Sequence, residues 1–173
     1  MIFRVLLFLC LISNALDGQA VKKVKNFVSK DSLYNENIKK SRLYGVYIPR
    51  DIDDALEKLM ELTSEEARKP MLKTDENTIA KKLYFGIGRW MEYNWNFEEG
   101  SRFSHYLRQK GLFYTEDMTR TMLILFHRRV VGNPLESEAL FNKMVEERSR
   151  KIEEERKKME VIKVEKIQNS SKG

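Results

Sequence analysis

Side chains suited to catalysis or metal binding are sparse in this sequence. It has two histidines, His105 and His127, which lie 22 positions apart. A metal site would need both to converge with a carboxylate such as Glu98, Glu99 or Asp117, and their spacing is unlike that of paired histidines on one helix. The sequence therefore predicts no metal and no cofactor, and it favours core or capping roles for both histidines.

Adjacent carboxylates offer a second kind of chemistry. The pairs Asp53-Asp54 and Glu65-Glu66 fall at predicted helix starts, where they would complement the helix dipole. Glu98-Glu99 falls in a predicted loop beside aromatic residues, and two carboxylates flanking a glycosidic bond can hydrolyse it. Neighbouring loop residues seldom have that geometry. A hydrolase of cell-envelope polymer that uses Glu98, Glu99, His105 or His127 is therefore the alternative function.

The junction between two predicted helices is the candidate groove for a ligand or partner. Trp90 and Trp95 would diverge by about 140° on one helix, so one of them is expected in the core and the other near the loop. We assign Trp90 to the core. Trp95 would then supply a stacking face, Arg102 a charged fork and Tyr106 a hydroxyl, with His127 nearby. Plain packing of these side chains is the other interpretation.

Helical spacing of apolar residues and capping signals predict an all-α fold: a small single-domain helical array with a long charged C-terminal helix. The helical domain is expected over residues 46–135. Asp51 and Ser101 are typical helix caps, and Gly132 is typical of a helix end. The uninterrupted apolar run at residues 122–126 predicts that its helix is the most buried one.

One predicted helix, which starts at Thr74 or Asp75, contains two glycines. Each glycine costs a helix about 0.5–1 kcal/mol relative to alanine. We expect the two glycines to permit close approach of a neighbouring helix or to mark a kink, and we assign the close approach to Gly86. Gly86 and Gly88 do not form a dinucleotide-binding fingerprint, because the third glycine and the surrounding βαβ unit are missing.

A charged helical tail is predicted over residues 136–173. Its first part has an apolar stripe, Leu140, Phe141, Met144 and Val145, that can dock on the core. Beyond Arg148 the heptad pattern is too poor for a coiled coil. We expect a solvated helix there, with a partner-binding or self-associating arm as the alternative.

The net charge of +6 is spread along the chain rather than gathered in one patch. Lysines stand near the front, at positions 22, 23 and 25, and the tail alternates in sign. Nucleic-acid binding would be favoured by a basic stripe interleaved with aromatic residues. The distribution indicates a solvated surface, and no nucleic-acid partner is expected.

Four runs of residues stand out together: IPRDIDDALEKL, LYFGIGRWMEYNW, GSRFSHYLRQKG and EDMTRTMLILFHRRVVG. They resemble an uncharacterised bacterial family, a domain of unknown function, over about residues 48–132. The resemblance implies no known activity, substrate or catalytic residue. The chain departs from the pattern at residues 96–99, where a tryptophan- and glycine-rich loop is expected, and at residues 114–117, where His-Pro-Asp-Asp is expected.

The N-terminus predicts export. A positive start at residues 1–4, eight apolar residues at 5–12 and small residues at 13–15 are typical of a signal peptide, here residues 1–20. The apolar run is too short to span a bilayer. Residues 21–45 read as a flexible polar spacer. Cys10, the single cysteine, would leave with the signal peptide, so the mature chain would have no disulfide.

These features predict a secreted or periplasmic protein that acts as a non-catalytic binding or interaction module. Its ligand is unknown. The expected partner is a protein or a cell-envelope component, without nucleic acid and without a transmembrane span.

We expect the mature chain to begin between Leu16 and Val21, because the small residues at 13–15 have the usual cleavage spacing. Intact-mass spectrometry of protein isolated from its native host measures the start. A mass that still includes residues 1–20 would contradict the signal peptide.

Overall fold

The structure is a computed structural model and describes residues 32–170; the predicted signal peptide lies outside them. Helices dominate the described chain, which confirms the all-α prediction, and the one small sheet is a two-stranded antiparallel hairpin. The elements are β1 (Arg42–Leu43), β2 (Val46–Tyr47), α2 (Ile52–Leu62), α3 (Glu65–Arg68), a 3-10 turn (Lys69–Lys73), α4 (Glu76–Leu83), a π-helical turn (Tyr84–Gly88), α5 (Arg89–Asn94), α6 (Arg102–Gln109), α7 (Thr115–Val131) and α8 (Ser137–Ser170).

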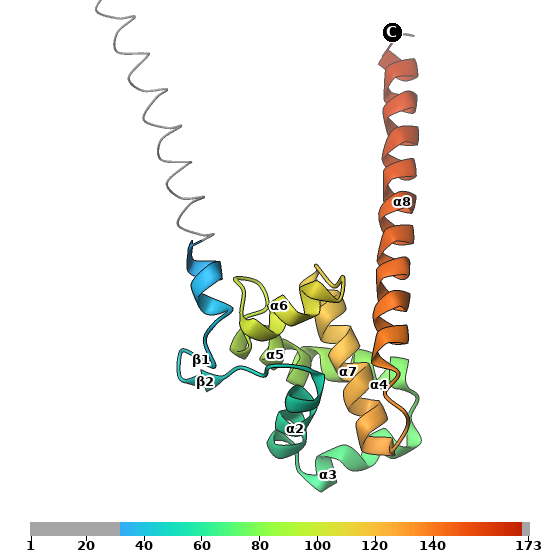
Figure 1. The fold of residues 1–173 in the computed structure, drawn as a ribbon. Helices are drawn as coiled ribbons and strands as arrows, with labels where there is room; N and C mark the ends of the chain where they lie inside the picture. The colour runs from blue at the N-terminus through green and yellow to red at the C-terminus, as the bar shows by residue number, and fades with distance from the viewer. Residues whose placement is uncertain (1–31, 171–173) are drawn as a thin grey trace, which may run out of the picture.

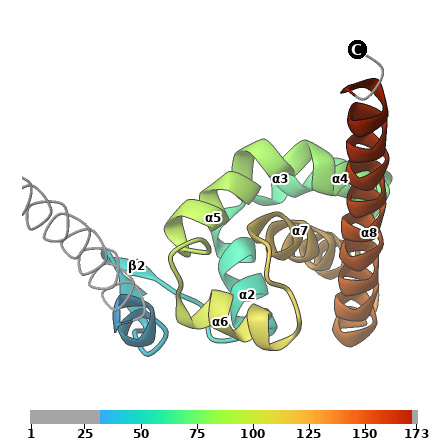
Figure 2. The same ribbon diagram turned by 90° about the horizontal axis from the view of Figure 1, so that it is seen from above.

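Helix α7 is the centre of the fold. Figure 2 shows it in the middle of the molecule, with α2 and α6 on one side, α4 and α5 on another, and α8 beside it. All residues from Thr121 to His127 are buried. A helix that is apolar around most of its circumference must be covered on all sides. The prediction that this helix is the most buried one is confirmed.

Side-chain caps start the helices where the sequence predicts them. Asp51 accepts a hydrogen bond from the backbone NH of Asp54 at 3.0 Å, and Asp75 caps α4 in the same way. Ser101 and Ser104 form a reciprocal capping box at the start of α6. At the C-terminal end of α7, Gly132 ends the helix at φ 76°, a conformation that favours glycine.

The segment α4–α5 differs from the prediction at Gly86 and at both tryptophans. Gly86 is exposed, and a Cβ atom there would meet nothing within 4 Å. The close approach occurs at Gly88, where a Cβ would lie 3.1 Å from Cγ2 of Thr119 in α7. The roles of the two tryptophans are the reverse of those predicted. Trp95 is the core residue, with 1% of its surface exposed, whereas Trp90 is half-buried against it.

The predicted spacer is wrong from residue 32 onward. Residues 32–37 are helical, and the hairpin β1–β2 follows. Tyr34 fastens this helix to the domain, because its hydroxyl bonds Nδ1 of His105 at 2.9 Å. Its ring also covers Gly100, where a Cβ would lie only 2.2 Å from the ring. The missing side chain of Gly100 therefore makes room for Tyr34.

Helix α8 docks by its first turns and then leaves the body of the domain (Figure 1). Leu140, Phe141 and Met144 are buried, as the stripe predicts. Arg148 ends the docked part, because its guanidinium donates to both carboxylate oxygens of Asp117 at 2.6 and 2.7 Å. Farther along, Ile152, Met159 and Ile162 are exposed. Within residues 32–170, no helix is both long and apolar enough to cross a membrane.

The two glycines provide a matched stability test. Gly88→Leu should lower the free energy of unfolding by about 1–3 kcal/mol, because the side chain would be forced into α7. Gly86→Leu, two residues away and facing open space, should stay within about 0.5 kcal/mol. Denaturant midpoints measure both, and equal midpoints would contradict the packing at Gly88.

Candidate functional site

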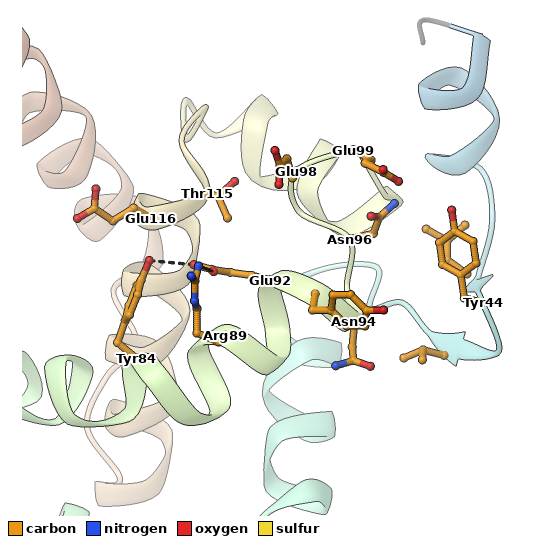
Figure 3. Close-up of a pocket in the computed structure, with 13 residues that line it drawn as sticks. Tyr44, Tyr84, Arg89, Glu92, Asn94, Asn96, Glu98, Glu99, Thr115 and Glu116 are labelled. Atoms are coloured by element: carbon orange, nitrogen blue, oxygen red, sulfur yellow. Dashed lines mark hydrogen bonds and ion pairs between the residues drawn. The ribbon is translucent and has the colours of Figure 1, made fainter. Parts of the chain in front are cut away.

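An open cavity of about 1080 Å³ lies between the hairpin, α5, the loop after α5 and the start of α7 (Figure 3). Its lining combines apolar and aromatic side chains with four carboxylates. The hairpin contributes Leu43, Tyr44 and Val46, and the π-turn contributes Tyr84. The other lining residues are Arg89, Glu92, Tyr93, Asn94, Asn96, Glu98, Glu99, Thr115 and Glu116.

Glu92 forms the fixed floor of this cavity. Its side chain is only 10% exposed. Oε1 accepts hydrogen bonds from the hydroxyls of Tyr84 at 3.0 Å and Thr119 at 2.8 Å, and Oε2 accepts one from Arg89 at 2.7 Å. These donors come from the π-turn, α7 and α5. The carboxylate therefore ties three elements together.

The π-turn brings Tyr84 and Glu92 to the same face. In an unbroken α-helix, residues eight apart point about 80° apart, whereas residues seven apart differ by only about 20°. A π-turn inserts one extra residue. Tyr84 and Glu92 are consequently placed as if they were seven apart. Burial, together with the hydrogen bond to Glu92, raises the pKa of the Tyr84 phenol.

Glu98 and Glu99 lie on the rim, in a tight loop that begins at Asn96. Asn96 has φ 51°, and its side-chain amide donates to the carbonyl of Gly100 at 3.0 Å. Phe97 anchors the loop in the core, and Arg108 donates to the Phe97 carbonyl at 3.1 Å. Glu98 and Glu99 themselves are exposed, and neither forms an ion pair with another described residue.

Two tyrosines add aromatic surface to the cavity. Tyr44 is 82% exposed at the tip of the hairpin, where Tyr44 and Gly45 both have positive φ. This is the turn geometry that suits the twist of a two-residue hairpin. Tyr93 is 85% exposed on α5. The hairpin tip and α5 thus present flat apolar faces beside the carboxylates.

The structure does not bring the four predicted groove residues together. The stacking face predicted for Trp95 is wrong, because the ring is buried among Phe97, Phe103 and Trp90. Burial raises the pKa of Tyr106, which stacks on Phe103 with centroids 6.2 Å apart. These aromatic side chains therefore pack against one another and do not line a groove.

Arg102 is a structural link rather than a free cation. Nε donates to the carbonyl of Ile48 at 2.8 Å, and Nη2 donates to the same oxygen. The guanidinium also lies over the ring of Tyr47, 5.1 Å from its centroid. Arg102 therefore fixes the chain between β2 and α2 onto α6.

Each histidine is held by neighbouring polar groups. His127 is buried, with Nε2 3.0 Å from the Met71 carbonyl and 2.8 Å from that of Thr74. His105 is bound by Tyr34 at Nδ1 and by Gln109 at Nε2, the latter at 3.1 Å. Throughout residues 32–170, no group of three or more histidine, cysteine or acidic residues could hold a metal ion.

The main residues that sequence reasoning missed are Tyr44, Tyr84, Glu92 and Tyr93. The one local signal was the pair of glycines in a helix, which marks an irregular turn. Glu98 and Glu99 were singled out from the sequence, as a possible hydrolytic pair, and they do line the cavity.

Residues 48–130 match the family model described as Domain of unknown function (DUF6794). The predicted resemblance to a domain of unknown function is therefore confirmed. No curated protein and no solved structure matches the chain significantly.

The DUF6794 match starts at Ile48, the residue that Arg102 binds, and ends at Val130 in α7. It contains α2 to α6 and leaves out the hairpin and α8. The cavity is consequently shared: the matched segment supplies its floor and acidic rim, and the preceding hairpin supplies the wall with Tyr44.

Two tyrosines of the same segment test the floor of the cavity. Tyr84→Phe removes a donor to a nearly buried carboxylate and should lower the free energy of unfolding by about 1–3 kcal/mol. Tyr93→Phe, which removes an exposed hydroxyl, should change it by less than about 0.5 kcal/mol. Equal losses in chemical denaturation would show that Glu92 does not depend on Tyr84.

Proposed function

We propose that this protein is a non-catalytic binding module whose open acidic cavity holds a cationic segment of a partner. One observation carries the proposal: the exposed carboxylates of Glu98 and Glu99 lie beside the exposed rings of Tyr44 and Tyr93 on one cavity. Carboxylates form charge-assisted hydrogen bonds with ammonium and guanidinium groups, and tyrosine faces attract the same cations.

The floor supports binding because it is already ordered. Glu92 is fixed by its three donors, and the rim loop is fixed by buried Phe97 and by the Asn96 amide. A surface that is rigid before binding loses less conformational entropy when a partner docks. The cavity is therefore suited to recognition without rearrangement.

The partner that fits is a lysine- or arginine-rich stretch of a protein, or a cell-envelope component that carries amino groups. The affinity of such a partner would rise with every rim carboxylate that it contacts. Because these carboxylates are exposed, the attraction should weaken as salt rises. The export signal predicted from the sequence would place this binding in the periplasm or outside the cell.

Hydrolysis is less well supported than binding. A glycosidase needs two carboxyl groups on opposite sides of the bond, one of them protonated. Glu98 and Glu99 are neighbours on one exposed loop, and the oxygens of Glu92 are already bonded. His105 and His127 are each engaged by other groups. These contacts favour a binding role over an acid–base role.

A fluorescent lysine octamer tests the proposed binding. The double variant Glu98→Gln/Glu99→Gln should bind it about five- to thirtyfold more weakly than the wild type, since two charge-assisted contacts are lost. The matched control is Glu154→Gln/Glu155→Gln, an exposed adjacent pair on the projecting part of α8. The control has the same net charge, so it should bind like the wild type. Equal weakening of both variants would refute the cavity as the binding site.

A further inference from the structure

We propose that the acidic cavity is occupied by the chain's own lysine-rich segment, residues 21–30, which an external cationic partner must displace. This inference rests on the proposed function and names the first ligand of the same site. The segment would thereby regulate the cavity, because an external partner binds only after displacing it.

The chemistry of the segment complements that of the cavity. Its sequence is VKKVKNFVSK, with Lys22, Lys23, Lys25 and Lys30 and without an acidic residue. Valines and Phe27 are interspersed with the lysines, so an extended segment would offer both ammonium groups and apolar side chains. The cavity offers Glu98 and Glu99 for the first and Tyr44 and Tyr93 for the second.

The described chain begins at the rim of the cavity. Tyr34 is pinned beside the acidic loop, because its ring covers Gly100, the residue directly after Glu99. Arg108 lies over the same ring, 5.3 Å from its centroid. Figure 3 shows the helix of residues 32–37 on the same side of the cavity as Tyr44. The lysine-rich segment is therefore tethered next to the carboxylates.

Because the segment is tethered, weak contacts are sufficient to keep it docked in the cavity. Ten residues reach up to about 33 Å when extended, which is more than a cavity of about 1080 Å³ requires. A short tether gives an effective concentration in the millimolar range. Exposed ion pairs that are each worth little can then keep the segment in place against a dilute external partner.

Zero-length carbodiimide cross-linking of the full chain tests the occupancy directly. Lys22, Lys23, Lys25 or Lys30 should be joined to Glu98 or Glu99 in the peptide mass spectrum, and these links should vanish in Glu98→Gln/Glu99→Gln. An equal mixture of isotopically light and heavy chains should give links within one isotope only. Mixed-isotope links would show that the segment docks on a second copy of the chain, which would overturn self-docking. Links to carboxylates elsewhere would also overturn the proposal.

Competition with the lysine octamer provides the second readout. The variant Lys22→Ser/Lys23→Ser/Lys25→Ser should bind the octamer about three- to tenfold more tightly than the wild type, because the tethered competitor is weakened. The control Lys151→Ser/Lys157→Ser/Lys158→Ser removes the same charge from α8 and should bind like the wild type. Equal octamer affinity of all three chains, without cross-links, would overturn self-docking and leave the proposed function standing. Cross-links without any octamer binding would support self-docking and refute binding of an external cation.

Discussion

The buried carboxylate of Glu92 is the contact on which the arrangement of the cavity depends. A nearly buried charge is costly unless hydrogen bonds replace its water. Tyr84, Arg89 and Thr119 supply those bonds from three separate elements. The need to satisfy one charge therefore fixes the π-turn and α5 against α7.

Gly88 completes the same junction from the apolar side. Because it has no side chain, the π-turn approaches Thr119 and Leu123 closely enough for the Thr119 hydroxyl to reach Glu92. Packing and hydrogen bonding thus act at adjacent points of α7. The resulting floor is rigid, while the carboxylates on the rim remain in solvent.

Within residues 32–170, charged side chains at the core are paired, whereas those on the rim of the cavity are not. Cations that touch the core are already paired: Arg128 with Glu76, Arg148 with Asp117, and Arg102 with the Ile48 carbonyl. The rim carboxylates have no such partner among the described residues. This contrast is the basis of the proposed binding of lysines, including the chain's own.

The sequence by itself determined the helices, their capped starts at Asp51, Asp75 and Ser101, the glycine end at Gly132 and the burial of residues 122–126. These features depend on neighbours within a few positions, or on the helical repeat alone. Only the tertiary structure decided which tryptophan is buried, which glycine touches α7 and what Arg102 binds. The π-turn adds one residue and rotates everything after it by about 100°, so that Gly88 and Trp95 face the core where the sequence had predicted Gly86 and Trp90. That rotation is stabilised by contacts with α7, about 30 residues further along the chain, and no local pattern reveals them.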